Sequence, residues 1–145
     1  MKFLAQRVNS ASLWADGEFI SEIGCGLVVY FGVKAGDTET QAEKCAEKIA
    51  NLRVFEDDAG KMNRSVKDVG GEILFVSQFT LYGDCRRGTR PSFTDAELPV
   101  RAKALYDYAT EHLKKQGVPV KTGVFGADMR ILQDNRGPVS IIYEI

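Results

Sequence analysis

The chain has 145 residues, with 19 Lys plus Arg against 20 Asp plus Glu, a formal charge of −1 and one histidine. This length favours a single domain over residues 1–145, and 44% hydrophobic with 27% charged residues is typical of a globular protein. The balanced charge excludes nucleic-acid binding through a bulk positive field. The lone His112 excludes two-histidine zinc sites and H-E-x-x-H proteases.

The first third of the chain carries strand signals that are followed by one helix. Three strand segments are expected: Phe3–Val8, a hairpin over Ser12–Ile20 that turns at Asp16-Gly17, and the apolar run Gly26–Val33. Apolar residues then recur at helical spacing over 38–53, where Thr38 and Gln41 have the spacing of a capping box.

The remainder of the chain repeats the order of strand, helix and strands. Residues 71–82 (GEILFVSQFTLY) are expected to form a buried strand, and 95–116 a second amphipathic helix that Thr94 and Glu97 would cap. Closing strands are expected at 118–124 and 139–145. This order predicts an α+β fold, a mainly antiparallel β-sheet or barrel with two amphipathic helices.

Targeting and metal signals are weak. The first residues lack the apolar stretch of a signal peptide, and no apolar run approaches the ~20 residues of a membrane span, so we expect a cytoplasmic protein without a membrane partner. The three cysteines lack C-x-x-C spacing. Asp57, Asp58 and Asn63 loosely resemble a calcium loop, but the EF-hand spacing and closing Glu are missing, so neither a metal nor a cofactor is expected.

Four consecutive residues place two hydroxyls and an amide in an otherwise apolar segment. They are Ser77, Gln78, Phe79 and Thr80. They form either a strand end that emerges from the core or the wall of a polar pocket.

A loop rich in arginine follows this segment. It contains Arg86, Arg87 and Arg90 together with Cys85. The arginines are either solvated charges or ligands for phosphate, whose geometry the guanidinium matches. No general base is near Cys85 in the sequence.

Two glycine-containing features lie near the end of the chain. Phe125 and Met129 stand among glycines and form either a slot for a flat ring or a bulge in a closing strand. Pro138 is expected to open the last strand, and Gly137 beside it leaves room for backbone to approach a ligand. Taken alone, Gly-Pro favours a trans turn.

Two strings and their order carry a family resemblance. Ser77–Leu81 (SQFTL) and Asn135–Ser140 (NRGPVS) match the two signatures of D-aminoacyl-tRNA deacylases of the bacterial and eukaryotic type, the second with Ser140 in place of threonine. Familiar flanking strings extend the resemblance over the whole chain: Gln6-Arg7-Val8, Gly60-Lys61-Met62-Asn63, Arg90-Pro91-Ser92-Phe93, Ala104-Leu105-Tyr106 and Gly126-Ala127-Asp128-Met129.

The resemblance implies a homodimer with active sites at the subunit interface. The substrate would be tRNA carrying a D-amino acid, or glycine on the wrong tRNA. Gly137-Pro138 would be a cis peptide that enters the partner's pocket, binds the α-amino group through main-chain oxygens and leaves no room for an L side chain. Arg7 would brace this dipeptide.

The resemblance also suggests how the remaining residues act. Ser77, Gln78, Phe79 and Thr80 would orient the ester, with the substrate's 2′-hydroxyl favoured over Thr80 as the group that assists hydrolysis. Phe125 and Met129 would contact the terminal adenine, and Arg86, Arg87 and Arg90 the phosphates of the acceptor stem. The alternatives are a non-catalytic RNA-binding module and a thiol hydrolase that uses Cys85 with His112.

Overall fold

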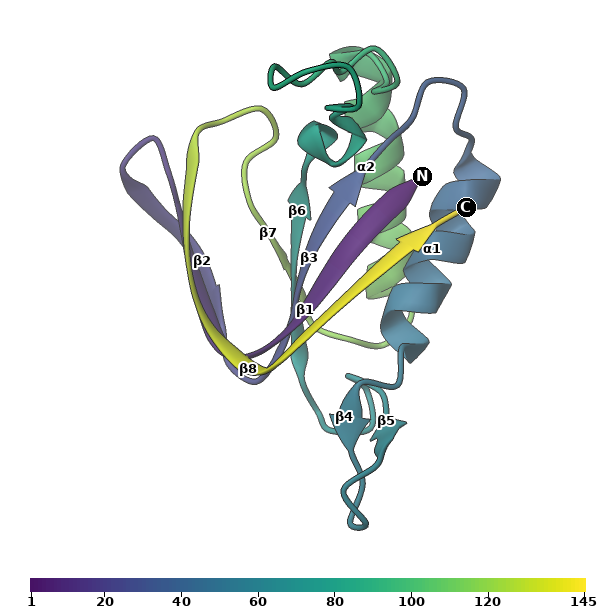
Figure 1. Cartoon of the computed structure of the whole chain (residues 1–145). Coiled ribbons are helices and arrows are strands. Elements are labelled where there is room, and N and C mark those ends of the chain that lie inside the picture. Colours follow the sequence, from purple (N-terminus) through teal and green to yellow (C-terminus); the bar gives the residue numbers. More distant parts are fainter.

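The computed structural model describes residues 1–145 (Figure 1). Its strands are β1 (Lys2–Ala15), β2 (Glu18–Ile23), β3 (Gly26–Gly32), β4 (Phe55–Glu56), β5 (Met62–Arg64), β6 (Glu72–Ser77), β7 (Val120–Thr122) and β8 (Met129–Glu144). The helices are α1 (Glu39–Asn51) and α2 (Pro99–Lys114), and a short 3₁₀ helix, η1 (Phe79–Tyr82), follows β6. The predicted α+β class is confirmed.

Strand β1 is the centre of the main sheet. It pairs antiparallel with β2, β3 and β8, whereas the β3–β6 and β6–β7 pairings are parallel. The outer strands β2 and β7 approach each other, because Ser21 Oγ donates to the Thr122 carbonyl at 3.1 Å and Lys121 Nζ donates to the Glu22 carbonyl at 2.6 Å. The result is a nearly closed barrel in which antiparallel pairing predominates, as predicted.

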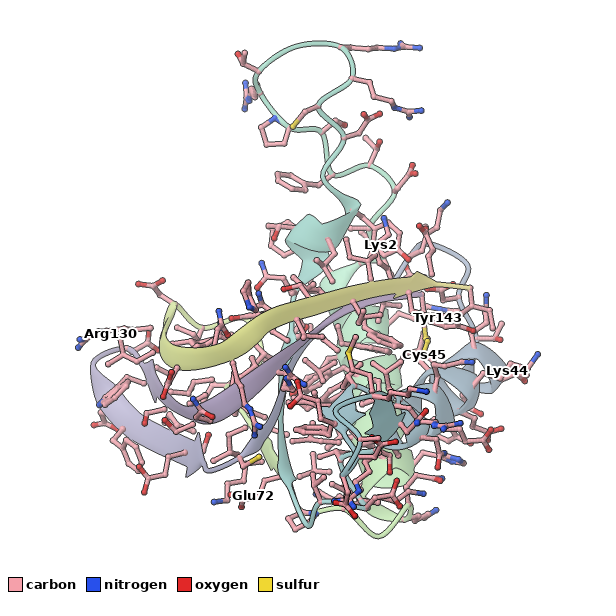
Figure 2. All side chains as sticks on the ribbon, turned by 60° about the horizontal axis from the view of Figure 1, so that its bottom comes forward. Lys2, Lys44, Cys45, Glu72, Arg130 and Tyr143 are labelled. Carbon is pink, nitrogen blue, oxygen red and sulfur yellow. The ribbon has the colours of Figure 1, made fainter.

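Both helices cover one face of this sheet (Figure 1), where 23 buried residues form the main core. Phe75 of β6 stacks on Tyr106 of α2 with ring centroids 5.1 Å apart, and the Tyr106 hydroxyl donates to the Phe75 carbonyl at 2.7 Å. Cys45 of α1 lies in this core, where Tyr143 of β8 packs against it (Figure 2). Burial raises the pKa of the Cys45 thiol to about 11. Neither α1 nor α2 combines the length and the hydrophobicity that a membrane-spanning helix requires.

Local turn and cap signals in the first third of the chain are confirmed. Asp16 and Gly17 form the turn between β1 and β2, with φ angles of 50° and 87°. Thr38 is the N-cap of α1, and its N–H donates to the Gln41 side chain at 2.7 Å. Both signals depend on neighbours within three residues, so the local sequence is enough to predict them.

Helix α2 begins later than predicted. It starts at Pro99, whose fixed φ suits the first helical turn. The capping box predicted at Thr94 and Glu97 is wrong. The Glu97 carboxylate instead accepts the N–H of Leu98 at 2.9 Å and of Gly36 at 3.2 Å, and these bonds lower its pKa.

The predicted extents of several strands are also wrong. β1 runs unbroken to Ala15, because β8 pairs with it along almost its whole length. The buried strand predicted to reach residue 82 ends at Ser77, because its partner β3 ends at Gly32. β8 begins at Met129, so Pro138 lies inside the strand, where an edge position and a bulge accommodate it. The turn-rich segment 55–71 contains the hairpin β4–β5.

Candidate active site

The predicted wall of the active site lies where β6 ends. Ser77 is the last residue of β6, and the Gln78 N–H still donates to the Phe31 carbonyl of β3 at 2.8 Å. The chain then turns into η1, whose first hydrogen bond runs from the Leu81 N–H to the Gln78 carbonyl. The Gln78 side-chain amide donates to the Thr80 hydroxyl. The four residues therefore form a turn at a strand end rather than a continuing strand.

A cavity of about 470 Å³ opens beside this wall. Ser77, Gln78 and Phe79 line it from one side, and Phe125 and Met129 from the segment that enters β8. Most of the residues around it are hydrophobic, and a cavity with apolar walls and a few polar groups is the usual form of a small-ligand site. Five residues singled out from the sequence thus share one cavity.

The sequence did not identify the segment that leads into α2, or the first turn of that helix, as part of this cavity. Phe93, Leu98 and Ala102 also line it, and Phe93 meets Phe79 edge to face with ring centroids 5.1 Å apart. Phe79 is 56% exposed and Leu98 74% exposed. Large apolar side chains left in solvent beside a cavity indicate a binding surface. No pattern in the sequence distinguishes them from core residues.

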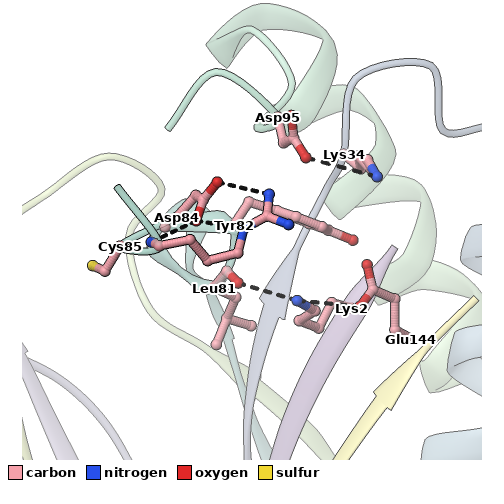
Figure 3. Close-up of a pocket in the computed structure, with 10 residues that line it drawn as sticks. Lys2, Lys34, Leu81, Tyr82, Asp84, Cys85, Asp95 and Glu144 are labelled. Atoms are coloured by element: carbon pink, nitrogen blue, oxygen red, sulfur yellow. Dashed lines mark hydrogen bonds and ion pairs between the residues drawn. The ribbon is translucent and has the colours of Figure 1, made fainter. Parts of the chain in front are cut away.

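A second, larger cavity of about 620 Å³ lies against Leu81 and Tyr82 (Figure 3). Its cations are already paired with carboxylates: Lys2 with Glu144 at 3.2 Å, Lys34 with Asp95 at 3.8 Å, and Arg86 with Asp84 at 2.8 Å. Because no positive charge is left free for an anion, the smaller, apolar cavity is the better candidate for the active site.

Gly137 and Pro138 lie in a bulge of β8 beside Arg7. Gln6 pairs with Ser140 and Val8 with Asn135, so four residues, 136–139, face the single residue Arg7. The Gly137–Pro138 peptide bond is cis. Gly137 has φ +123°, and a Cβ there would lie 3.0 Å from the Val139 nitrogen and 3.1 Å from Arg7 Nη2. Only glycine fits this position without a shift of the backbone.

Arg7 fastens the start of this bulge. Its side chain is buried, Nε donates to the Arg136 carbonyl at 3.2 Å, and Nη1 donates to the Val54 carbonyl at 2.7 Å. Its Nη2 lies 3.6 Å from Glu56 Oε1. These contacts hold the residue that precedes Gly137.

Within one chain, the wall and the Gly137–Pro138 bulge lie at different levels of the sheet. Arg7 pairs with Leu27 of β3, and Leu27 pairs with Ile73 of β6. Ser77 lies four residues further along β6, which is about 13 Å at the rise of a strand. The residues of the cavity are brought together, but the bulge is not brought to them.

Comparison with known proteins identifies the family. Residues 4–144 match the family described as D-Tyr-tRNA(Tyr) deacylase. D-aminoacyl-tRNA deacylases from Bacillus cereus and from Bacillus thuringiensis (strain Al Hakam) are each 52% identical to the chain over 144 residues, which is 99% of both sequences. The chain belongs to the D-aminoacyl-tRNA deacylase family. The members of this family are hydrolases.

Solved structures with the same fold agree with this assignment. A structure of the c-Myc DNA Unwinding Element Binding Protein is 42% identical with a TM-score of 0.93, and the match covers 100% of this chain and 99% of that one. A probable eukaryotic D-amino acid tRNA deacylase is 18% identical with a TM-score of 0.85, covering 99% and 98% of the two chains, and shows the shared fold.

The arginine loop of this deacylase-family chain extends away from its body (Figure 2), and its three arginines differ in their surroundings. Arg86 is hydrogen-bonded to Asp84 through Nε and Nη2 at 2.9 and 2.8 Å, which lowers the pKa of Asp84 to about 2. Arg87 and Arg90 form no ion pair, and all three arginines line a hollow of about 300 Å³. Two of the three guanidiniums are therefore free for an external anion.

The single histidine lies away from the cavity. His112 Nε2 is 3.8 Å from Glu47, and its ring stacks on Tyr108. It is ten residues along α2 from Ala102, which lines the cavity, a rise of about 15 Å. Cys85 lines the other cavity, so a Cys85–His112 hydrolase has no geometric support. Membership of an enzyme family also argues against a non-catalytic RNA-binding module.

Proposed function

We propose that the chain performs D-aminoacyl-tRNA deacylation, the reaction of its family, in the cytoplasm and without a cofactor. Water cleaves the ester between the aminoacyl carbonyl and the terminal ribose, and free D-amino acid and tRNA leave. Glycine on the wrong tRNA is a second substrate, because it also lacks an L side chain. The observation that carries this proposal is the 470 Å³ cavity that gathers wall residues Ser77–Phe79 with Phe125 and Met129.

The wall residues Ser77, Gln78, Phe79 and Thr80 orient the ester and stabilise the oxyanion that develops on it. The N–H groups of Phe79 and Thr80 precede the first hydrogen bond of η1, so they are backbone donors without a helical partner. The Thr80 hydroxyl is engaged by the Gln78 amide, which is not a base. We therefore propose that the substrate's own 2′-hydroxyl assists the attack of water on the ester. Thr80 does not act as the nucleophile.

Two substitutions separate these mechanisms. Thr80→Ala should keep most of the activity, whereas a tRNA that ends in 2′-deoxyadenosine should lose it. Single-turnover release of labelled D-amino acid measures both. The opposite pattern, with an inactive Thr80→Ala and a reactive deoxy substrate, would establish Thr80 as the nucleophile.

The Gly137–Pro138 bulge of one copy of the chain acts as the chiral filter in the active site of a second copy. Support comes from the distance of about 13 Å along the sheet that separates the bulge from its own wall. β8 pairs only with β1, and it leaves Leu132 and Ile142 50% and 70% exposed. A second copy would cover such apolar side chains on an edge strand. A filter of main-chain atoms contacts what all amino acids share, so it is indifferent to the identity of the side chain.

A mixed dimer tests this arrangement. One copy carries Gly137→Ala, and the other carries a wall substitution, at Gln78 or Phe79, that is first shown to abolish activity on its own. Each active site of the mixed dimer then takes its wall from one copy and its filter from the other, so one site in the dimer is intact. A purified mixed dimer should recover about half of the wild-type rate, and random equal mixing about a quarter, if sites are shared between copies. No recovery in a dimer of verified composition would refute it.

Phe125 and Met129 bind the terminal adenine in the apolar cavity, and the loop arginines bind phosphates of the acceptor stem. Replacing Arg87 and Arg90 by Gln should raise KM for the aminoacyl-tRNA. It should also reduce the slope of log binding constant against log salt concentration by about one for each phosphate that the loop no longer binds. Replacing Arg86 should do less, since Asp84 already neutralises it. Unchanged kinetics in the double variant would remove this loop from the tRNA interface.

The activity is tested with matched D- and L-aminoacyl-tRNA, with and without a thiol-alkylating agent. D-selective release that resists alkylation supports the proposal. An absence of release would favour the RNA-binding module, and release that alkylation abolishes would favour the thiol hydrolase.

A further inference from the structure

We propose that the β4–β5 hairpin sets the stereospecificity of the enzyme, with Glu56 as the positioning residue that holds the Gly137–Pro138 bulge through Arg7 and Arg136. This inference rests on the proposed function of the bulge as a chiral filter. The hairpin forms a two-stranded sheet of its own, outside the main sheet. Its link to the bulge therefore depends on side chains rather than on strand pairing.

Glu56 lies between the two arginines that border the bulge. Its Oε1 is 3.6 Å from Arg7 Nη2, and its Oε2 is 3.6 Å from Arg136 Nη2. Arg136 is the residue directly before Gly137, and its carbonyl accepts the Arg7 Nε–H at 3.2 Å. The Glu56 carboxylate thus faces two guanidiniums, that of Arg7 opposite the bulge and that of Arg136 directly before Gly137.

Arg7 needs this carboxylate because it is a buried cation. It is 4% exposed, and its two hydrogen bonds go to the neutral carbonyls of Arg136 and Val54. Glu56 is the one carboxylate within 4 Å of its guanidinium. A buried charge without a counter-ion is costly, so loss of Glu56 favours movement of Arg7 toward water. Such a movement releases the Arg136 carbonyl and, with it, the start of the bulge.

The hairpin presents Glu56 in a fixed position. The neighbouring Asp57 accepts the N–H groups of Ala59 and Lys61 through Oδ1, each at 2.9 Å, and the Asn63 amide through Oδ2 at 2.7 Å. The bond from Asn63 is the main reason that the pKa of Asp57 is lowered. Arg53 in turn donates to the Asn63 carbonyl and side chain, both at 2.8 Å. Of the residues that resemble a calcium loop in the sequence, Asp57 and Asn63 therefore close a turn of the backbone instead.

The test compares two carboxylates of the same hairpin. Glu56→Gln removes the charge that faces Arg7. Asp58→Asn is the matched control, because Asp58 is 94% exposed and pairs at 2.7 Å with Arg64, not with either arginine of the bulge. The measured quantity is the ratio of kcat/KM for D- and L-aminoacyl-tRNA carrying the same side chain, together with the Tm of each variant.

We expect Glu56→Gln to lower the D-to-L ratio about tenfold, intermediate between the effects of losing an exposed and a buried ion-pair partner, and Asp58→Asn to leave it within about twofold of wild type. A general loss of folding would lower the D and L rates together and leave their ratio unchanged. An unchanged ratio in Glu56→Gln, or an equal fall in Asp58→Asn, would overturn the proposal.

Proton exchange at Arg7 Nε–H, followed by NMR, provides a readout that does not depend on activity. Exchange should be slow in wild type and in Asp58→Asn, and at least about tenfold faster in Glu56→Gln. If the wild-type protein shows no D-selective release, the proposed function fails. The exchange measurement then decides whether Glu56 holds Arg7 at all, and equal exchange in all three proteins would refute that as well.

Discussion

Replacement of Gly137 by alanine is the most direct perturbation of the proposed chiral filter. The backbone there has φ +123°, a region that L side chains rarely adopt, and such strain costs about 1–3 kcal/mol. The added Cβ would also lie 3.0 Å from the Val139 nitrogen and Cγ2, and 3.1 Å from Arg7 Nη2. The arginine can shift, but the backbone nitrogen cannot move without opening the bulge.

These terms together suggest a cost of about 2–3 kcal/mol for holding the native bulge. If only chains with the native bulge turn over the D substrate, kcat/KM for D-aminoacyl-tRNA falls by roughly 30- to 160-fold. Release of labelled amino acid under kcat/KM conditions measures this, with the L substrate assayed in parallel. If the rate for the L substrate rises while the D rate falls, the bulge has lost its native conformation and no longer excludes the L side chain. If both rates fall, the altered bulge blocks the site.

Gly117→Ala provides the control. Gly117 also has a positive φ, +80°, but a Cβ there meets nothing within 4 Å, and it follows the end of α2 away from the cavity. The Gly117→Ala variant should be less stable than wild type, while its ratio of kcat/KM for the D and L substrates stays at the wild-type value. A wild-type rate and ratio in Gly137→Ala would refute the assignment of the filter to this bulge.

Three further predictions concern stability, each measured by urea unfolding. Tyr106→Phe leaves the buried Phe75 carbonyl without its 2.7 Å donor and should cost about 1–3 kcal/mol. Asp37→Asn breaks the pair with the Met1 α-amino group, 2.7 Å away with both groups at most 5% exposed, and should cost about 3–5 kcal/mol. Burial raises the pKa of Cys45 from 9.0 to about 11, so the unfolded chain loses this proton first. Stability is then full below pH 9 and should fall by about 1.4 kcal/mol at pH 10, a loss that Cys45→Ala should remove.

The parts of the fold that were predicted correctly depend on short-range signals. The turn at Asp16-Gly17 and the capping box at Thr38 involve residues within three positions of each other. The first half of β8 could not be predicted in this way. Its residues 129–136 are mixed in polarity because one side is exposed, and they become a strand by pairing with β1, more than a hundred positions earlier in the chain.

The candidate site shows the same division. Ser77, Gln78, Phe79, Phe125 and Met129 were singled out from the sequence, and they line one cavity. Phe93 and Leu98 were missed as site residues, because only the tertiary fold brings the segment before α2 to the end of β6. Glu56 was missed because its role depends on Arg7, which is remote in sequence. A residue that acts through a distant partner leaves no local pattern.

Both segments proposed to act on the substrate lie where regular strand pairing stops. β6 leaves the sheet after Ser77 because β3 ends at Gly32, and β8 bulges where four of its residues face Arg7. Regular pairing uses up the N–H and C=O groups of a strand, whereas a strand end and a bulge leave some of them available to a ligand. A chain whose one histidine is packed against Glu47 and Tyr108 has to rely on such main-chain groups. Main-chain groups also suit this substrate, because handedness at the α-carbon is the property to be tested and side-chain identity is not.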